Sequence, residues 1–271
     1  MSLEYIRLET KRRFFSKRIG EHTSAYSGSG VAFKDLVAYD SSQSVRHINW
    51  KKSTKTAIVA NSYYDDRQLN VALIYLNSGS LAYKNKQQKA LEALTALTTV
   101  AIEQKEALTT LFFNSKESKF LPPTKRRDTI TRNYNLAKKC NYQGEIETSR
   151  LTSEVLHKVQ KRSLLFFIGD FLEPIDFSYL SRLYEIYAIV IRDRSEEELD
   201  LSGELNIVDL NSQKKEFITV NRRSQKVYNK LFKEYDRELI EGFRANRVEF
   251  IKVYTSDNTV AKLVELTRWK R

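Results

Sequence analysis

The sequence predicts an α/β protein built on a doubly wound, mostly parallel sheet. Three observations support this fold class. Short, continuous apolar runs recur along the chain, as expected of strands that are buried on both faces. Between several of these runs, apolar residues stand three to four positions apart, which is typical of helices that pack one side onto a sheet. Only 8 Gly and 3 Pro occur in 271 residues, too few for a turn-rich β fold.

Residues 1–70 are expected to form an N-terminal helix and a β-rich extension. A helix is predicted over 1–19, where aromatic and aliphatic residues interrupt charged positions. Short extended segments are predicted near 31–33 and 57–64, in a stretch where Gly and Ser are frequent. Trp50 is a lone large aromatic in polar surroundings, so we expect it to be buried and to fasten the extension to the rest of the chain.

Residues 71–271 are expected to form the sheet domain, in which strands and helices alternate. The predicted strands are 71–76, 107–113, 163–170, 184–191 and 248–254, and the predicted helices are 89–104, 149–162, 223–245 and 258–269. Two short segments flank Asn211-Ser212-Gln213, which predicts a β-hairpin inserted near 204–220.

Charge and cysteine usage restrict the classes of function. The formal net charge is +12, but no nucleic-acid motif accompanies the basic clusters at 11–13, 125–127 and 268–271. A solvated basic surface or a protein partner is therefore favoured over nucleic acid. The single Cys140 excludes an internal disulfide and a cysteine-based zinc site. Because the apolar runs are too short to span a membrane and the N terminus is charged, we expect a soluble, cytoplasmic protein.

Polar residues follow two of the predicted strands at their carboxyl ends. The strand 71–76 opens onto Asn77-Ser78-Gly79-Ser80, and the strand at 163–168 ends in Gly169-Asp170. Ligands of doubly wound sheets bind beyond the carboxyl ends, where the strand order reverses. If these strands are neighbours, two hydroxyls and a carboxylate converge, which suits Mg²⁺. A phosphate cradle fits less well, because no Walker or dinucleotide motif is present, and a plain turn is the other interpretation.

The residues around these positions carry a family resemblance. Residues 71–83 and 163–172 resemble the ends of strands one and four of von Willebrand factor A domains, whose metal-ion-dependent adhesion site has the pattern D-x-S-x-S. Residues 20–70 resemble the signature of the family called domain of unknown function 58, roughly G-x-G-x-x-F-x-D-L-R-x-Y followed by G-D-D-x-R-x-I-D-W-x-x-S-A-R. The residues in register are Phe33, Asp35, Leu36, Tyr39, Arg46, Ile48, Trp50 and Ser53.

This resemblance implies a von Willebrand A-like fold with a degenerate metal site. Ser78 and Ser80 match the two motif serines, and Asp170 matches the carboxylate of strand four. Thr148, or alternatively Thr152, would supply the remaining hydroxyl. Leu76 stands where the motif has its aspartate, and a leucine cannot ligate Mg²⁺. We therefore expect weak or no Mg²⁺ binding, no other cofactor, and tighter Mg²⁺ binding in Leu76→Asp.

The resemblance also implies a partner, because this family is often encoded beside MoxR-type AAA+ ATPases. We expect a non-catalytic adaptor that binds such an ATPase, with Arg46, Trp50 and Asn77 as partner-binding residues. The acidic segment 193–200 is either solvated or a contact for a basic partner. The alternatives are a basic protein associated with nucleic acid or with an anionic membrane and, more weakly, a metal-dependent enzyme.

Overall fold

The computed structural model describes residues 27–39, 48–54, 58–64, 70–208, 210 and 214–266. These residues belong to two units, one within residues 17–68 and the other continuous from Leu69 onward. The helix expected over 1–19 and the partner-binding candidate Arg46 lie outside the described residues.

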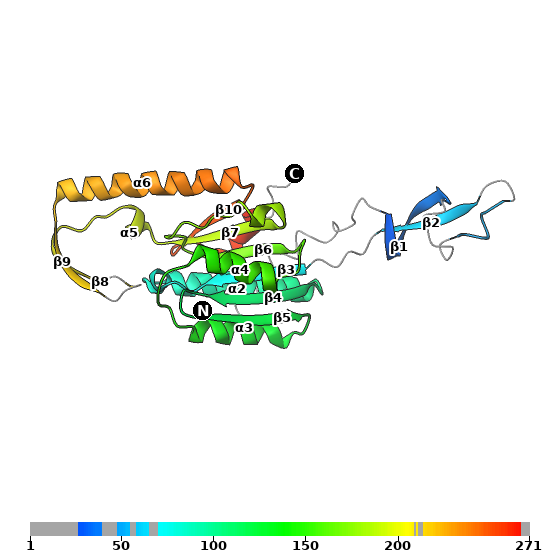
Figure 1. Ribbon diagram of the computed structural model, residues 1–271, viewed down its shortest axis with the longest axis horizontal. Coiled ribbons are helices and arrows are strands. Elements are labelled where there is room, and N and C mark those ends of the chain that lie inside the picture. Colours follow the sequence, from blue (N-terminus) through cyan, green and yellow to red (C-terminus); the bar gives the residue numbers. More distant parts are fainter. Residues whose placement is uncertain are drawn as a thin grey trace. The chain divides into compact units, whose positions relative to one another are not determined.

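The smaller unit is built on an antiparallel pair of strands, β1 (Ser27–Ala38) and β2 (Val59–Tyr64) (Figure 1). Ile48 forms an isolated bridge to Ala60, and both side chains are buried. The Ser53 hydroxyl donates to the carbonyl of Asn49 over 2.9 Å and accepts from the backbone N–H of Val59 over 3.0 Å. These bonds close the turn between 49 and 53 onto β2.

Trp50 is exposed within this unit, which corrects the expectation that its ring is buried. The side chain is 70% exposed and lies in the turn that follows Ile48. An aromatic residue in a polar stretch was a poor indicator of burial here. The exposed ring keeps Trp50 available as a contact for a partner.

Replacing Trp50 with alanine is therefore expected to change the free energy of unfolding by less than about 0.5 kcal/mol, as for other exposed positions. Ile48→Ala, two residues away, is the matched control and is expected to cost about 2 kcal/mol or more. Urea unfolding followed by circular dichroism measures both. A loss of several kcal/mol in Trp50→Ala would show that the ring is buried after all.

The larger unit contains a six-stranded sheet of order β10-β7-β6-β3-β4-β5. The strands are β3 (Asn70–Leu76), β4 (Ala107–Phe113), β5 (Ser118–Thr124), β6 (Leu164–Gly169), β7 (Glu185–Arg192) and β10 (Glu249–Tyr254). All neighbours are parallel except β4 and β5, which are antiparallel. The chain leaves β3 first toward β4 and later returns to β6, so the strand order reverses between β3 and β6. Tyr75 pairs with Ile168 in register, which confirms that these two strands are neighbours.

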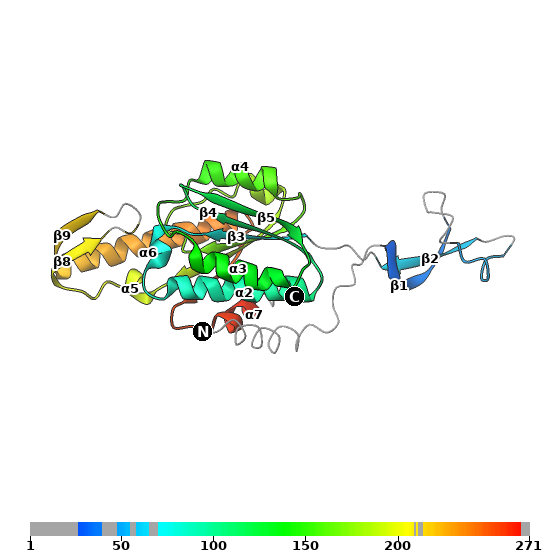
Figure 2. The ribbon, with the colours of Figure 1, turned by 90° about the horizontal axis from the view of Figure 1, so that it is seen from below.

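Helices cover both faces of this sheet (Figure 2). One face packs against α2 (Lys86–Glu103), α3 (Asp128–Lys139) and α7 (Thr259–Leu266). The other packs against α4 (Thr148–Lys158) and the end of α6 (Arg222–Ala245). Successive residues of β3 alternate between the two cores, with Leu73 and Tyr75 in the first and Ile74 and Leu76 in the second. The fold is thus the von Willebrand A-like α/β arrangement.

Strand β5 and helix α3 are two elements that the sequence did not predict. β5 carries Pro122 and Pro123, which interrupt any strand pattern. Proline is tolerated there because β5 is the edge strand of the sheet, where one side makes no ladder hydrogen bonds. Helix α3 has an apolar stripe of only a few residues, Ile130 and Ala137 among them, that packs on α2.

The predicted hairpin forms its own two-stranded sheet from β8 (Gly203–Val208) and β9 (Lys215–Val220). It follows the short helix α5 (Arg194–Glu197), which itself follows the carboxyl end of β7. The hairpin and the first half of α6 therefore lie beyond the carboxyl edge of the central sheet (Figures 1 and 2). Among the helices of the described chain, none has the length and apolar character that crossing a bilayer demands.

Candidate functional site

The predicted convergence of polar side chains occurs at the carboxyl edge, where β3 and β6 end. The Ser78 hydroxyl donates to Oδ1 of Asp170 over 3.2 Å, and the hydroxyls of Ser78 and Ser80 are 3.1 Å apart. Ser80 lies in the short 3₁₀ turn Gly79–Ala82 that follows β3. Ser78 and Asp170 are both almost fully buried. The two strand ends are therefore joined by side chains and not only by the sheet.

Lys86 supplies the positive charge of this cluster. Its Nζ lies 3.0 Å from Oδ2 of Asp170 and 2.5 Å from Oε1 of Glu196, and the side chain has no exposed surface. Lys86 is the first residue of α2, where the helix dipole disfavours a cation. The two carboxylates offset this penalty and the cost of burying the ammonium. Lys86 thus connects β6, α2 and α5 at one point.

Asp170 is held in its charged form by these neighbours. Burial is the largest single effect and would raise the pKa of its carboxyl, but the charge of Lys86 and the smaller effects of the other neighbours together outweigh it. The hydroxyl of Ser80 and the guanidinium of Arg192 act in the same direction as Lys86. The pKa of Asp170 therefore lies below its ordinary value, and the group is a carboxylate at neutral pH.

Helix α5 connects this cluster to the rest of the edge through its acidic residues. Asp193 caps the helix and accepts from Lys84 Nζ over 2.8 Å, while Glu197 accepts from Lys252 Nζ over 2.9 Å. Burial raises the pKa of Asp193, but hydrogen bonds from Lys84, Ser195 and Thr255 outweigh it and lower the pKa strongly. Asp193, Glu196 and Glu197 therefore bind lysines of the same chain, which neither interpretation of 193–200 expected. Glu198 and Asp200 of the same segment are exposed, and both interpretations stay open for them.

The residue after Asp170 has an unusual backbone. Phe171 lies in the left-handed region at φ 51°, which is uncommon for a large side chain. Its carbonyl accepts from the hydroxyl of Tyr235 and lies 3.5 Å from Nη2 of the fully buried Arg192. The Arg192 guanidinium also stacks 5.4 Å from the ring of Phe232. Contacts from β7 and α6 thus fix the turn that presents Asp170.

Two of the predicted site residues have other roles. Asn77 is 1% exposed, and its amide donates to the carbonyl of Asn141 over 2.9 Å, so it offers a partner no surface. The Thr148 hydroxyl donates to the carbonyl of Pro174 over 3.1 Å, at the start of α4. Both residues brace loops at the edge. The expectation that Asn77 contacts a partner is corrected by its burial.

The residues at this edge do not fit a Mg²⁺ ion. Both oxygens of Asp170 are engaged, one by the Ser78 hydroxyl and one by the Lys86 ammonium. The position of the motif aspartate holds Leu76, whose side chain is buried in the second core. Across the described part of the chain, no cluster of three His, Cys, Asp or Glu residues is arranged to hold a metal.

Sequence reasoning missed Lys86, which pairs with Asp170, and Glu196, the second carboxylate that Lys86 binds. Lys86 stands in the polar stretch "YKNKQQK", which reads as a solvated loop leading into a helix. A signal was nevertheless present: lysine in the first turn of a helix opposes the helix dipole and needs a nearby carboxylate. The sequence does not show which carboxylate, because Glu196 is 110 residues away along the chain.

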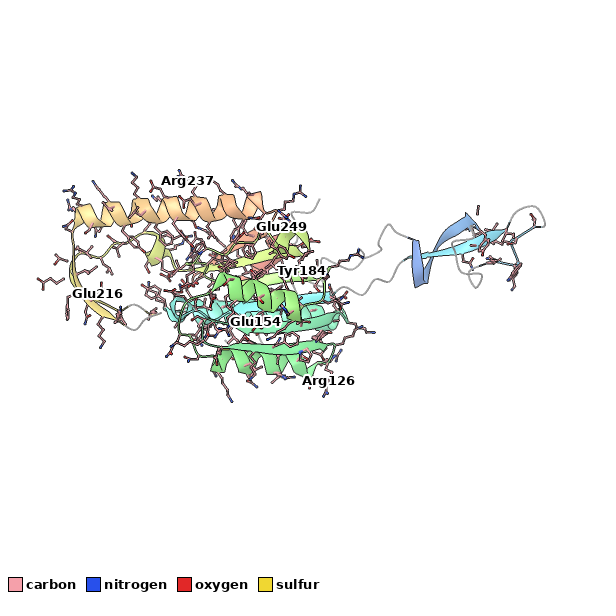
Figure 3. All side chains as sticks on the ribbon, in the orientation of Figure 1. Arg126, Glu154, Tyr184, Glu216, Arg237 and Glu249 are labelled. Atoms are coloured by element: carbon pink, nitrogen blue, oxygen red, sulfur yellow. The ribbon has the colours of Figure 1, made fainter. Side chains whose placement is uncertain are left out.

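An exposed apolar surface lies next to this edge. We call it the hairpin surface; its residues and their exposed fractions are Val208 (38%), Phe217 (84%) and Ile218 (37%) of the hairpin and Val227 (52%) and Leu231 (59%) of α6. Glu216, which is labelled in Figure 3, precedes Phe217 on β9. Within the hairpin, Phe217 and Ile218 point to opposite faces, because consecutive residues of a strand alternate. Apolar side chains are therefore exposed on both sides of this two-stranded sheet.

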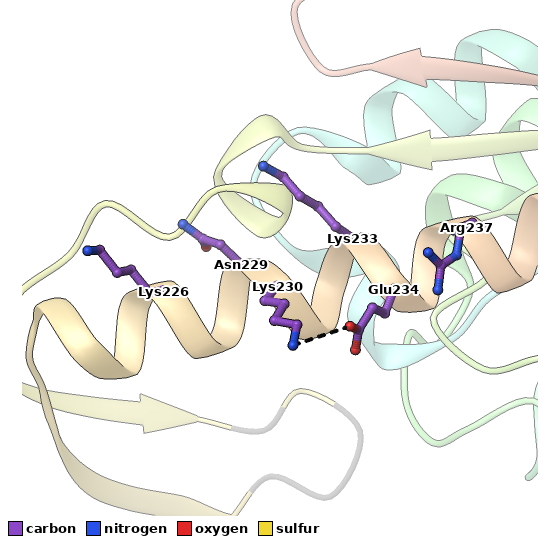
Figure 4. Close-up of a pocket in the computed structure, with 6 residues that line it drawn as sticks. All are labelled: Lys226, Asn229, Lys230, Lys233, Glu234 and Arg237. Atoms are coloured by element: carbon purple, nitrogen blue, oxygen red, sulfur yellow. Dashed lines mark ion pairs between the residues drawn. The ribbon is translucent and has the colours of Figure 1, made fainter.

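Helix α6 ties the hairpin surface to the buried cluster. The hydroxyl of Tyr228 donates to the carbonyl of Glu196 over 2.8 Å, and Asn229 accepts from the backbone N–H of Leu199 over 2.8 Å. Along the same helix, an open groove is lined by Lys226, Asn229, Lys230, Lys233, Glu234 and Arg237 (Figure 4). The groove is basic, because its lining contains lysines and an arginine but only one carboxylate, that of Glu234. Lys230 lies 3.8 Å from this carboxylate, which is a loose pairing.

Comparisons with known proteins give a family and several structural likenesses. A family model described as "Protein of unknown function DUF58" matches residues 35–238. The conserved hypothetical protein BatB from Bacteroides thetaiotaomicron is 8% identical, with a TM-score of 0.47, over 73% of this chain and 97% of that one. An aerotolerance-related membrane protein from Bacteroides fragilis is 12% identical, with a TM-score of 0.45, over 74% and 99%. The SpRpn10 VWA domain is 10% identical, with a TM-score of 0.39, over 75% and 95%. No curated protein matches the chain.

Proposed function

The chain belongs to the DUF58 family, whose function is unknown, and from this premise we propose that it is a non-catalytic adaptor that binds a partner protein. The contact is made by the hairpin surface, beyond the carboxyl edge of the sheet. The observation that carries the proposal is Phe217, a large aromatic side chain that is 84% exposed on a projecting hairpin. Exposed aromatic residues of this kind are typical anchors of protein interfaces.

The hairpin itself supports the proposal. A two-stranded sheet is marginally stable in water unless something covers one of its faces. Here Phe217 and Val208 are exposed on one face and Ile218 on the other, so neither face is fully covered by this chain. A partner that covers the hairpin surface would bury these side chains. The burial would stabilise the complex by about 25 cal/mol for each Å² of apolar area removed from water.

Charge favours an acidic partner. Exposed cations surround the hairpin surface at Lys214, Lys215, Arg222, Arg223 and Lys226. A second copy of the chain would bring the same positive charge, in a protein whose net charge is already +12. An acidic protein with an apolar groove therefore fits better than a second copy of the chain.

A non-catalytic role is supported by how the reactive groups are placed. Asp170 is held by Lys86 and Ser78. Burial raises the pKa of the Cys140 thiol to about 11, so little reactive thiolate exists at neutral pH. His157 is exposed on α4, and its Nδ1 is bonded to the carbonyl of Ser153 one turn earlier. These residues do not form a nucleophile and base pair with one another.

The partner that we propose is a MoxR-type AAA+ ATPase in the cytoplasm, an inference that rests on the family resemblance of residues 20–70. Trp50 would be a second contact, since its ring is exposed in the smaller unit. A different candidate function is association with an anionic membrane or nucleic acid, which the basic groove along α6 favours.

The test is binding of the full chain to the purified MoxR-type ATPase of the same organism, measured by isothermal titration calorimetry. Phe217→Ser/Leu231→Ser is expected to weaken binding at least about tenfold, or about 1.4 kcal/mol. Tyr179→Ser is the matched control, because Tyr179 is 55% exposed but precedes β7, at the amino edge of the sheet. Its affinity should equal that of the wild type.

Two outcomes would contradict the proposal. Equal affinities of wild type and the Phe217→Ser/Leu231→Ser variant would remove the hairpin surface from the interface. Cosedimentation with phosphatidylserine vesicles, without binding to the ATPase, would favour the membrane. Nucleic acid would be recognised by a log-linear loss of affinity with salt, in proportion to the number of phosphates contacted.

A further inference from the structure

The Lys86 ammonium performs the two tasks that a divalent cation performs at a carboxyl edge. It neutralises a buried carboxylate, at 3.0 Å from Asp170, and it ties together segments that are far apart in the sequence, since Glu196 lies 2.5 Å from the same Nζ. Ser78 contacts the other oxygen of Asp170. The cluster thus has the hydroxyl and carboxylate groups of an oxygen-rich metal site, with an ammonium as its cation.

Leu76 is the second difference from a metal site, because it replaces a metal-binding aspartate as Lys86 replaces the metal ion. Leu76 is the last residue of β3 and lies beside Gly169, the residue before Asp170. The two positions are so close that a Cβ added to Gly169 would lie 2.9 Å from the Cβ of Leu76. An aspartate at position 76 and a divalent cation together contribute a net charge of +1. Leucine and an ammonium contribute the same net charge. The pair Leu76 and Lys86 therefore leaves the charge that faces Asp170 and Glu196 unchanged.

We propose that Lys86 is a covalently fixed replacement for a divalent cation, which holds the carboxyl edge in one arrangement and excludes Mg²⁺. A second cation near the ammonium would be repelled by it and would meet a carboxylate whose two oxygens are already engaged. The inference concerns the chain alone, so it stands or fails independently of any partner.

The replacement also changes what this edge can bind. A metal ion with an open coordination position accepts a carboxylate from a partner. The Lys86 ammonium has three N–H donors, of which two point to Asp170 and Glu196, and its side chain has no exposed surface. A carboxylate of a partner cannot reach it. Recognition by this chain must then use residues outside the Asp170 cluster.

The experiment titrates Mg²⁺ and Mn²⁺ alone into the full chain, by calorimetry and by thermal melting. The wild type and Leu76→Asp are expected to bind neither ion, because both retain the ammonium. This replaces the tighter Mg²⁺ binding that the sequence predicted for Leu76→Asp, since the sequence did not show Lys86 at Asp170. Leu76→Asp/Lys86→Met is expected to bind Mn²⁺ at least about tenfold more tightly than the wild type and to melt at a higher temperature with the ion. Leu76→Asp/Lys84→Met is the matched control: it has the same change in charge but keeps Lys86, and it should bind neither ion.

Micromolar binding of Mg²⁺ by the wild type would overturn the proposal. Binding by the Lys84→Met control as tight as that of the Lys86→Met double variant would also overturn it, since the identity of the lysine would then be irrelevant. If the Lys86→Met double variant is unfolded without metal, circular dichroism with added Mn²⁺ decides. Recovery of the folded spectrum supports the proposal, and an unchanged unfolded spectrum contradicts it.

Discussion

Lys86→Met is expected to lower the free energy of unfolding by about 3–5 kcal/mol at neutral pH. The substitution keeps the aliphatic bulk of the side chain but removes the charge between Asp170 and Glu196, which lie 3.0 and 2.5 Å from Nζ. Removing one partner of a buried ion pair leaves the other charge desolvated and uncompensated, which is costly. Urea unfolding of wild type and variant measures the difference.

The control for this prediction is another ion pair of the same chain. Lys230 pairs with Glu234 on α6, but its side chain is 78% exposed, so Lys230→Met should cost less than about 1 kcal/mol. The double variant Lys86→Met/Asp170→Asn should regain part of the loss, because the uncompensated carboxylate is removed as well. If Lys86→Met and Lys230→Met cost the same, the buried cluster contributes nothing special to stability.

The difference in the free energy of unfolding between wild type and Lys86→Met should decrease as the pH is lowered. The pKa of Asp170 is lowered in the folded protein, so its carboxylate contributes stability above the ordinary value of about 3.9. This contribution is lost as the pH falls through that value toward the folded-state pKa. The gap between wild type and Lys86→Met should therefore be largest near neutral pH and shrink on acidification. A gap that grows below about pH 4 would contradict the assignment.

The sequence predicted the central sheet because its strands are continuous apolar runs. The polar residues at the ends of β3 and β6 predicted that these two strands are neighbours, which the strand pairing confirms. Local patterns failed where tertiary context decided the outcome. The two prolines of β5 are tolerated only because that strand is at an edge. Trp50 is 70% exposed although it is a large aromatic residue, so its type and its polar surroundings did not indicate burial.

The candidate site was predictable only in part, for a similar reason. Ser78 and Asp170 come together because each follows one of two adjacent parallel strands, whose carboxyl ends lie side by side. Lys86 and Glu196 come from α2 and α5, whose approach depends on how the helices pack. A lysine in a polar stretch has no local mark of burial, so its role as the cation of the cluster is visible only in three dimensions.

Phe243→Ala is expected to cost about 3–5 kcal/mol and to loosen α6 more than any other element. Phe243 is the one buried residue of this 24-residue helix. Its ring contacts those of Phe171, Phe177 and Phe250, with centroids 5.5, 6.0 and 5.3 Å away. The truncation removes the one fully buried attachment of the helix to the second core and leaves the partly buried Leu239, and the surrounding rings cannot close the cavity fully.

Hydrogen exchange distinguishes this local loosening from a uniform loss of stability. In Phe243→Ala, the amides of α6 and of the hairpin should exchange faster, while those of β3 and β4 on the far side of β6 should change least. Leu231→Ala is the matched control, because Leu231 is on the same helix but 59% exposed, and it should cost less than about 1 kcal/mol. If α6 keeps its protection in Phe243→Ala, the helix is held instead by its polar contacts: those of Tyr228 and Asn229 with the α5 segment, and the pair of Asp236 with Lys252 at 2.7 Å.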